Sequence, residues 1–210
     1  ISVIWLAGKM ETLKDIKSNQ VLTFEEKNAT TKWVEKKKVP TIFQEVSSPI
    51  NYTDAVVRTN DFKRQPLMVN PISFSGPCMV KGDFNKDGME DIFIGGETGV
   101  AGTLFVGGKG GTFKELKMPA FEADKESQDT DAVFFDADND GDTDLYVVSG
   151  GYNEYELKDA ALQDRLYIND GKGQFSKASK AIPDNIRGSK SCVRPVDFDH
   201  DGDLDLFVGG

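Results

Sequence analysis

The chain has 210 residues, of which 35 are acidic and 25 are basic, so its formal net charge is −10. Nucleic-acid-binding proteins need a basic surface, and this charge argues against that class of partner. No apolar run approaches the roughly twenty residues that span a bilayer, so we predict no transmembrane segment.

The first 72 residues precede the part of the chain with the clearest pattern. Residues 1–28 open with the alternating segment "ISVIWLAGKM" and predict a small β segment, whereas residues 29–72 indicate a linker. Within the linker, "TIFQEVS" around Phe43 is a candidate outer strand of an incomplete unit. The chain begins without Met and both ends look cut, so we expect a piece of a longer protein. The lack of a targeting segment in this piece therefore carries no information about the compartment.

Three acidic segments of nine residues follow: "DFNKDGMED" at 83–91, "DADNDGDTD" at 136–144 and "DFDHDGDLD" at 197–205. In each, oxygen-bearing side chains occupy positions 1, 3, 5 and 9, and glycine stands at position 6, where the chain must turn. Calcium takes roughly six to eight oxygen ligands, and position 7 would offer its backbone carbonyl. We therefore predict up to three Ca²⁺ sites. The predicted ligands are Asp83, Asn85, Asp87, Met89, Asp91, Asp136, Asp138, Asp140, Asp142, Asp144, Asp197, Asp199, Asp201, Asp203 and Asp205.

Two other interpretations of these segments are EF-hands and solvated acidic turns. An EF-hand needs Glu at loop position 12 and a helix on each side, but position 12 is Ile94, Val147 or Val208. Solvated turns would have no reason to repeat three times in one register. Three divalent ions carry six positive charges and would change the net charge from −10 to −4, so metal binding also explains much of the acidity.

Short runs of β-branched and aromatic residues flank each acidic segment and predict strands, so each segment joins the two strands of a hairpin. In the first two units, two further strands are joined by the glycine-rich turns "GGKGG" and "NDGKG". The acidic segments begin 53 and 61 residues apart, a period typical of propellers. We predict an all-β fold, a partial β-propeller of four-stranded antiparallel blades in residues 73–210. The blades fall at 73–118, 128–179 and 188–210, the last incomplete, so the remaining blades of a parent propeller are expected partners.

The acidic segment followed by an aliphatic strand and Gly-Gly resembles the FG-GAP, or VCBS, repeat of integrin-like β-propellers over about residues 73–210. The segments "IWLAGKMETLKDI" and "NQVLTF" are similar to the end of an ASPIC/UnbV, cartilage acidic protein-like domain. The resemblance implies an extracellular or cell-envelope calcium-binding propeller. We expect a binding or adhesion module with structural Ca²⁺ and a protein or carbohydrate ligand. The alternative is the propeller scaffold of a secreted polysaccharide-acting enzyme whose catalytic residues lie largely outside this chain.

Strand direction places the three acidic segments on one face of the propeller and the connections 97–102, 118–130, 151–163 and 180–190 on the opposite face. The insertion "YNEYELKDAALQ" on that opposite face carries Tyr152, Glu154, Tyr155 and Glu156, which are candidate ligand-binding residues. A merely solvated insertion explains the same residues equally well.

We predict no catalytic residue in the chain. The single histidine, His200, stands at position 4 of the third segment, where we expect its side chain to point outward. No GxSxG or HExxH motif is present. Asp129 with Asp131 is a possible acid–base pair, since sugar-cleaving enzymes use paired carboxylates, but nothing in the sequence identifies their partner.

The two cysteines and the strand aromatics have structural interpretations. Cys78 and Cys192 occupy the same place in strands two repeats apart, farther than the roughly 7 Å that a disulfide allows, so we predict buried free thiols. We predict Phe93, Tyr146 and Phe207 in the core between sheets.

Overall fold

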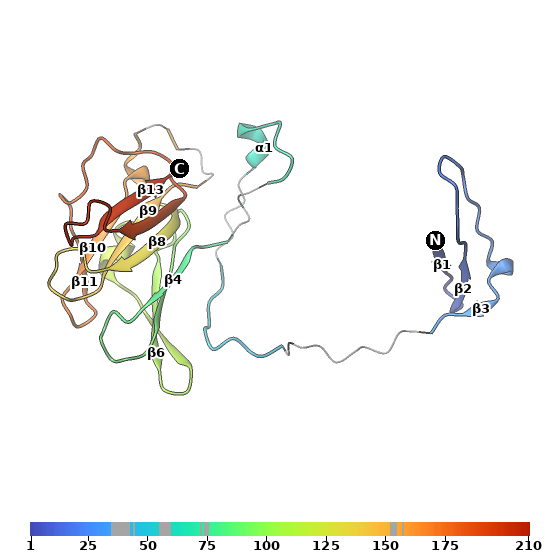
Figure 1. Ribbon diagram of the computed structural model, residues 1–210, viewed down its shortest axis with the longest axis horizontal. Helices are drawn as coiled ribbons and strands as arrows, with labels where there is room; N and C mark the ends of the chain where they lie inside the picture. The colour runs from blue at the N-terminus through green and yellow to red at the C-terminus, as the bar shows by residue number, and fades with distance from the viewer. Residues whose placement is uncertain are drawn as a thin grey trace. The chain divides into compact units, whose positions relative to one another are not determined.

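The computed structural model divides into two compact units, residues 1–47 and residues 48–210, and each is described by itself. Figure 1 shows the path of the chain through both. The structure describes residues 1–34, 43, 45–54, 60–71, 73, 76–151, 155–156 and 158–210.

The first unit contains the small antiparallel sheet that the alternating segment predicts. Its elements are β1 (Ser2–Ile4), β2 (Lys9–Thr12), the 3-10 turn η1 (Glu26–Asn28) and β3 (Thr31–Lys32), and the strand order is β1-β2-β3. A tight turn joins β1 to β2, because the Gly8 amide donates to the Trp5 carbonyl and Gly8 has a φ of 74°.

The second unit contains two complete blades. After the short helix α1 (Asp61–Arg64), the first blade consists of β4 (Met79–Gly82), β5 (Asp91–Ile94), β6 (Thr103–Gly108) and β7 (Thr112–Leu116). The helix α2 (Pro119–Glu122) leads into the second blade, which has β8 (Asp129–Phe135), β9 (Asp144–Ser149), the 3-10 turn η2 (Ala160–Leu162), β10 (Arg165–Asn169) and β11 (Phe175–Lys177). Each blade pairs its strands in chain order, antiparallel throughout, as predicted.

A two-stranded hairpin follows the second blade. Its strands are β12 (Cys192–Val196) and β13 (Asp205–Gly209), and β12 packs beside β8 just as β8 packs beside β4. The first strands of the two blades and of the hairpin are therefore neighbours, which is the arrangement of consecutive propeller blades. This confirms the predicted all-β fold of four-stranded antiparallel blades.

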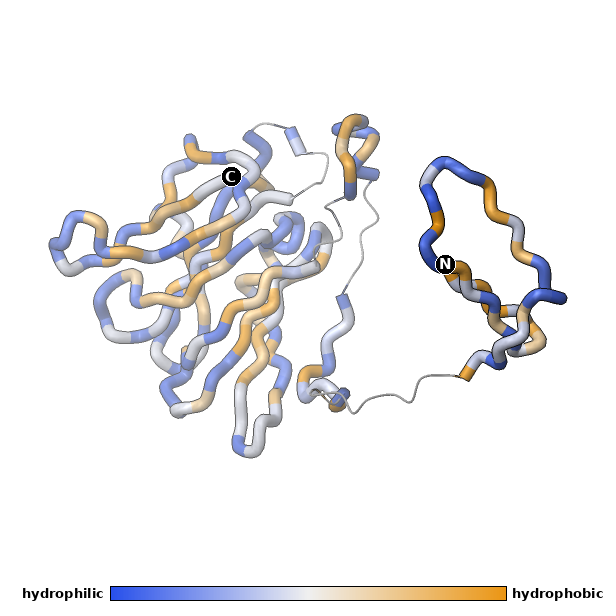
Figure 2. The backbone as a smooth tube through the Cα atoms, turned by 45° about the vertical axis from the view of Figure 1, so that its right-hand side comes forward, coloured by the Kyte–Doolittle hydropathy of each residue, from blue (hydrophilic) through white to orange (hydrophobic). Residues whose placement is uncertain are grey.

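The core lies between neighbouring blades, and β9 shows why. Successive strand residues point to opposite faces of a sheet. Leu145 and Val147 pack with the first blade, whereas Tyr146 and Val148 pack against Val193 of β12. All six residues of β9 are buried because a sheet lies on each side of this strand. Figure 2 shows hydrophobic residues along the strands of this unit and hydrophilic residues at its turns.

Two predictions need correction, and one helix was not predicted. Phe93 and Tyr146 are buried as predicted, but Phe207 is 64% exposed, because it lies on the face of β13 that is turned away from the second blade. The cysteines are free thiols as predicted, yet both are half-buried rather than buried. The crossover at 118–130 contains the helix α2, which the sequence analysis missed because it has only four residues, with Pro119 at its start.

Two other predictions concern the linker and the membrane. Of the candidate strand "TIFQEVS", residues 41, 42 and 44 lie outside the described residues, and residues 43 and 45–47 do not form a strand. Within the described ranges, the α-helices α1 and α2 have four residues each, and none is suited by length and hydropathy to crossing a bilayer.

Candidate metal centres

Each acidic loop closes a hairpin in the same register. The residue before position 1 pairs across the hairpin with the position-9 acid; the pairs are Gly82 with Asp91, Phe135 with Asp144 and Val196 with Asp205. The three loops therefore occupy equivalent places at one end of their hairpins, as the repeated pattern predicts.

Two turns with positive φ shape each loop. The first is at position 4, where Lys86, Asn139 and His200 have φ values of 58°, 59° and 63°. The second is at the position-6 glycine, where φ is 82°, 85° and 99° in chain order. The glycine turn was predicted, whereas the position-4 turn was not, because a non-glycine residue seldom adopts this conformation.

Backbone amides hold the loop carboxylates in place, as the second loop illustrates. The Gly141 amide donates to Asp136 Oδ2 at 2.9 Å, and the Asp142 amide donates to Asp140 Oδ1 at 2.8 Å. The first loop repeats these two contacts at equivalent positions, and the third repeats the second of them. Each of these acids thus gives at least one oxygen to the backbone of its own loop, and Asp83 gives both, because its Oδ1 accepts the Asp87 amide at 3.1 Å.

In two of the loops the carboxylates gather closely enough to hold a metal ion. Asp136, Asp138 and Asp144 each offer one oxygen within 4.8 Å of the others. The third loop groups Asp197, Asp199 and Asp201, so its position-5 acid joins the group where the second loop uses its position-9 acid. These clusters consist of hard oxygen donors, which suit a cation such as Ca²⁺ or Mg²⁺.

Two carboxylate oxygens in these clusters lack a hydrogen-bond partner among the described residues. Asp136 Oδ1 and Asp197 Oδ1, both at position 1, are buried and have no hydrogen-bond partner among the described residues. Leaving such a group unsatisfied costs about 1–3 kcal/mol, or more when it is charged. A cation bound in each of these two loops would satisfy the oxygen there, so the residues present fit a metal ion.

The position-9 acids also accept backbone amides that hold the loop and the neighbouring strand in place, a role that the sequence did not reveal. Asp144 accepts the Ala137 amide at 2.9 Å and the Asn169 amide at 2.8 Å, and Asp91 accepts the equivalent amides of its own blade. Burial raises the pKa of Asp91 and Asp144, the amides oppose this rise, and the neighbouring loop acids add to it. A cation would stabilise the charged form of both groups.

The first loop differs from the other two. Position 3 is Asn85, whose Oδ1 accepts the Asp87 amide at 3.0 Å. Within this loop, all of which the structure describes, Asp83, Asp87 and Asp91 do not form a close carboxylate group like those of the other loops. Lys86 forms an ion pair with Asp142 of the second loop, a contact that the sequence did not reveal.

Three of the connections predicted to lie opposite the acidic loops contact one another. The Gly99 amide donates to the Lys125 carbonyl at 2.7 Å, and the Tyr155 hydroxyl lies 2.6 Å from Thr98 Oγ1 and donates to the Glu126 carbonyl. Tyr155 therefore ties three connections together. Of the other candidate ligand-binding residues, Glu156 is exposed, and Tyr152 and Glu154 lie outside the described residues.

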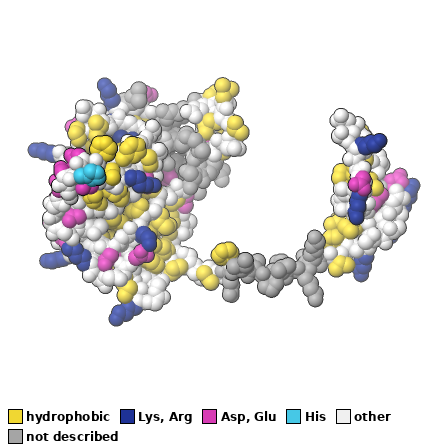
Figure 3. Space-filling view, in the orientation of Figure 1, with side chains coloured by type: hydrophobic (Ala, Val, Ile, Leu, Met, Phe, Trp, Pro, Cys, Tyr) yellow, Lys and Arg dark blue, Asp and Glu magenta, His cyan; other side chains and the backbone are white. Residues whose placement is uncertain are grey.

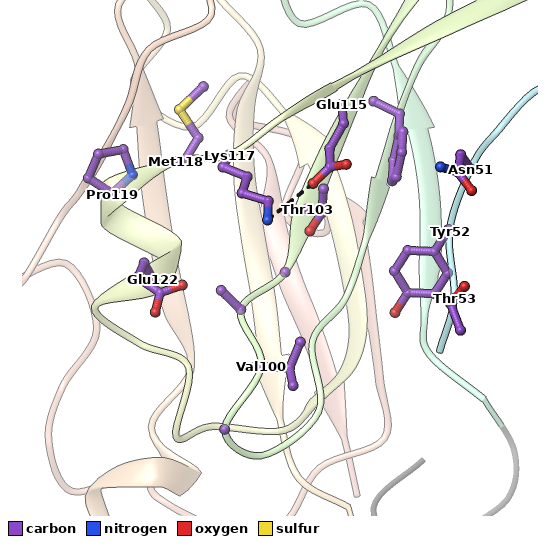
Figure 4. Close-up of a pocket in the computed structure, with 14 residues that line it drawn as sticks. Asn51, Tyr52, Thr53, Val100, Thr103, Glu115, Lys117, Met118, Pro119 and Glu122 are labelled. Carbon is purple, nitrogen blue, oxygen red and sulfur yellow. Dashed lines mark ion pairs between the residues drawn. The ribbon is translucent and has the colours of Figure 1, made fainter. Parts of the chain in front are cut away.

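A pocket of about 650 Å³ lies on the first blade, where sequence reasoning placed no site. In Figure 4, Tyr52 and its neighbours form one wall, and Lys117, Pro119 and Glu122 line the opposite wall. The Tyr52 ring meets Phe105 edge-on, with centroids 6.3 Å apart. Only the tertiary fold brings residues 51–53 to β6, so no local pattern announces this pocket.

The acids considered for acid–base chemistry are both engaged. Asp129 lies 2.6 Å from Arg165 and accepts the Gly96 amide at 2.7 Å. Burial raises the pKa of Asp129, whereas the Arg165 guanidinium and the Gly96 amide oppose that rise. Asp131 forms an ion pair with Arg194 at 2.7 Å. These contacts tie strands and connections together.

Comparison with known proteins supports the repeat. The model of the FG-GAP-like repeat family matches residues 83–147 and again residues 148–208. No curated protein and no solved structure shows significant similarity to the chain. The first match starts at position 1 of the first acidic loop, and both matches end within a strand that follows such a loop. Because the two matches together span more than half of its residues, the chain belongs to the FG-GAP-like repeat family.

Proposed function

We propose that this chain is the calcium-binding part of a β-propeller that serves as an extracellular or cell-envelope binding or adhesion module. The observation that carries the proposal is the pair of buried position-1 oxygens, Asp136 Oδ1 and Asp197 Oδ1, which lie in carboxylate clusters and have no hydrogen-bond partner among the described residues. Their membership of a repeated loop favours a function that the repeats share.

Up to three Ca²⁺ ions would bind, one in each loop. The side chains at positions 1, 3, 5 and 9 and the carbonyl at position 7 would supply at least five protein oxygens. This number favours Ca²⁺, since Mg²⁺ usually keeps several waters and takes one or two carboxylates. The metal's contribution is charge neutralisation within the hairpin. Its role is structural, because each loop joins the first two strands of a repeat.

A ligand-binding role is supported by the connections opposite the loops and by the pocket on the first blade. The pocket combines the Tyr52 ring with Glu115, Lys117 and Glu122, which suits a polar ligand with an apolar face, such as a protein segment or a carbohydrate. A rigid sheet carrying variable connections is also a common arrangement for recognition.

We propose a non-catalytic role. Asp129 and Asp131, the acids considered for catalysis, are paired with Arg165 and Arg194. The resemblance of residues 1–28 to the end of an ASPIC/UnbV domain favours the same extracellular or envelope setting. We further propose that the blades belong to a larger propeller.

Thermal unfolding tests the structural role of calcium. A ligand that binds only the folded state adds stability by mass action. The Tm of the chain should be higher in excess Ca²⁺ than in chelator, and Mg²⁺ should have a smaller effect. The double variant Asp136→Asn and Asp197→Asn is the matched control and should lose most of the difference. A Tm that is equal in Ca²⁺ and in chelator would overturn the proposal.

A further inference from the structure

The acidic loops of neighbouring repeats contact each other by one rule. Lys86, at position 4 of the first loop, forms an ion pair with Asp142, at position 7 of the second. Asn139, at position 4 of the second loop, donates from Nδ2 to Oδ1 of Asp203, at position 7 of the third, at 2.9 Å. Because position 7 offers the metal its carbonyl, its carboxylate remains available for this contact.

The residue at position 4 of the third loop has the backbone conformation and a side chain suited to the same contact. His200 has a φ of 63°, so its backbone turns as it does at the two earlier position-4 residues. A histidine ring N–H donates a hydrogen bond to a carboxylate, as the amide of Asn139 does. His200 is exposed, and no contact of this kind to a further loop exists among the described residues.

The hydrophobic part of the interface repeats as well. Phe84 and Phe93 of the first repeat are each 1% exposed, because Phe84 packs against Phe134 and Phe93 packs against Phe121. Their counterparts in the third repeat have the same places in the loop and in the following strand. Those counterparts, Phe198 and Phe207, are 80% and 64% exposed. Figure 3 shows the histidine beside acidic side chains and close to a group of hydrophobic side chains.

We propose that His200, Phe198 and Phe207 form a docking surface for a further FG-GAP-type repeat whose loop carries an acid at position 7. The proposal rests on the proposed function, because it names the chemistry of the next blade in the larger propeller. The surface continues the interface already formed between the three repeats: aromatic side chains supply the burial, and the contact between positions 4 and 7 selects the partner. His200 is thus a specificity-determining residue.

A second copy of this chain does not fit the surface through its first blade. The first loop has Met89 at position 7, so it offers no carboxylate to His200. The other face of that blade is also occupied, because Phe105 is 2% exposed and its ring meets Tyr52. The partner must therefore present an open blade face together with the acid.

The test is an extended chain in which a second copy of residues 97–177 follows Gly210. Gly96 and Gly210 end the equivalent segments "DIFIGG" and "DLFVGG", so the appended copy continues the repeat in register. It supplies the elements that cover Phe93 in the native chain and a loop with its own Asp142. Tm is measured in Ca²⁺ for the 210-residue and extended chains, each with and without Phe207→Asp or His200→Ala.

We expect Phe207→Asp to lower the Tm of the extended chain by about 5 °C or more, since it places a charge in a newly buried interface. His200→Ala should lower that Tm by a smaller amount, and only while the appended loop keeps its acid; Asp142→Met in the appended copy should abolish the His200 effect. Both substitutions should leave the Tm of the 210-residue chain nearly unchanged.

Three results would overturn the inference. The first is a substitution effect that is equal in both chains. The second is an appended segment that hydrogen exchange shows to be unfolded. The third is self-association of the 210-residue chain that Phe207→Asp abolishes, because a second copy would then occupy the surface. Calcium titration of the 210-residue chain is run in parallel. If the chain binds no calcium, the proposed function is contradicted. The effect of His200→Ala on the extended chain tests the docking surface separately.

Discussion

The guanidinium of Arg165 lies 2.6 Å from the carboxylate of Asp129 inside the second blade, and each side chain is only 4% exposed. Arg165 also donates to Ser149 Oγ at 3.0 Å, and Asp129 accepts the Gly96 amide. This pair therefore joins β8, β9 and β10 to the connection between β5 and β6 of the first blade.

We expect Arg165→Ala to destabilise the fold by about 3–5 kcal/mol, because it leaves the Asp129 charge buried without its partner. The matched control is Arg194→Ala, which breaks a pair of the same chemistry in which the arginine side chain is 69% exposed. That control should cost about 1 kcal/mol or less. Urea unfolding of both variants in Ca²⁺ measures the difference, and equal losses would show that burial does not set the strength of these pairs.

Asp140→Ala should damage the chain more than His200→Ala. Asp140 is a predicted position-5 ligand and accepts the Asp142 amide, so its loss removes both a metal oxygen and a contact that shapes the loop. His200 is exposed, and its substitution leaves the proposed ligands intact. Calcium affinity and Tm are measured for the two variants. If both lose the same affinity, the assigned register of the loops is wrong.

The first loop should release calcium before the other two. It has three carboxylates at the coordinating positions where the others have four, and Lys86 stands beside it. Since ligand charge tunes calcium affinity, Asn85→Asp should strengthen this site. The measurement is calcium titration of variants that each keep one intact loop. Equal affinity of the 83–91 loop and the other loops would mean that ligand charge does not set the order.

Alkaline pH should destabilise the fold through Cys78. Burial raises the pKa of this thiol from 9.0 to about 12, and the nearby Asp129 charge adds to the rise. Because the folded pKa exceeds the unfolded one, the neutral thiol's contribution is complete below pH 9 and is lost as pH rises from 9 towards 12. Unfolding free energies from pH 8 to pH 11 should fall less steeply for Cys78→Ala. Identical slopes would rule out this cause.

The sequence predicts much of the fold and of the metal centres because both depend on local patterns. Alternating acids, a glycine at position 6 and short β-branched strands act within a single hairpin, so reading them required no tertiary information. The same repetition predicted the blades and the face that carries the loops.

Contacts between repeats could not be predicted in this way. Which side chain meets Lys86, or which acid meets Arg165, depends on how one blade stacks on the next. The exposure of Phe207 has the same origin: its type and place match those of Phe93, but a following sheet covers only the latter. The Tyr155 hydroxyl likewise contacts connections that are distant in sequence. Because these contacts depend on the tertiary fold, the sequence suggested only that Tyr155 recognises a ligand.

Direct measurement of bound calcium tests the central claim most sharply. The chain is treated with chelator, dialysed against a series of free Ca²⁺ concentrations, and analysed for calcium per chain by atomic emission. The account predicts saturable binding that approaches three ions per chain, and one fewer in each of the variants Asp87→Ala, Asp140→Ala and Asp201→Ala. A chain that binds no calcium, or whose calcium content is unchanged by these three substitutions, would contradict it.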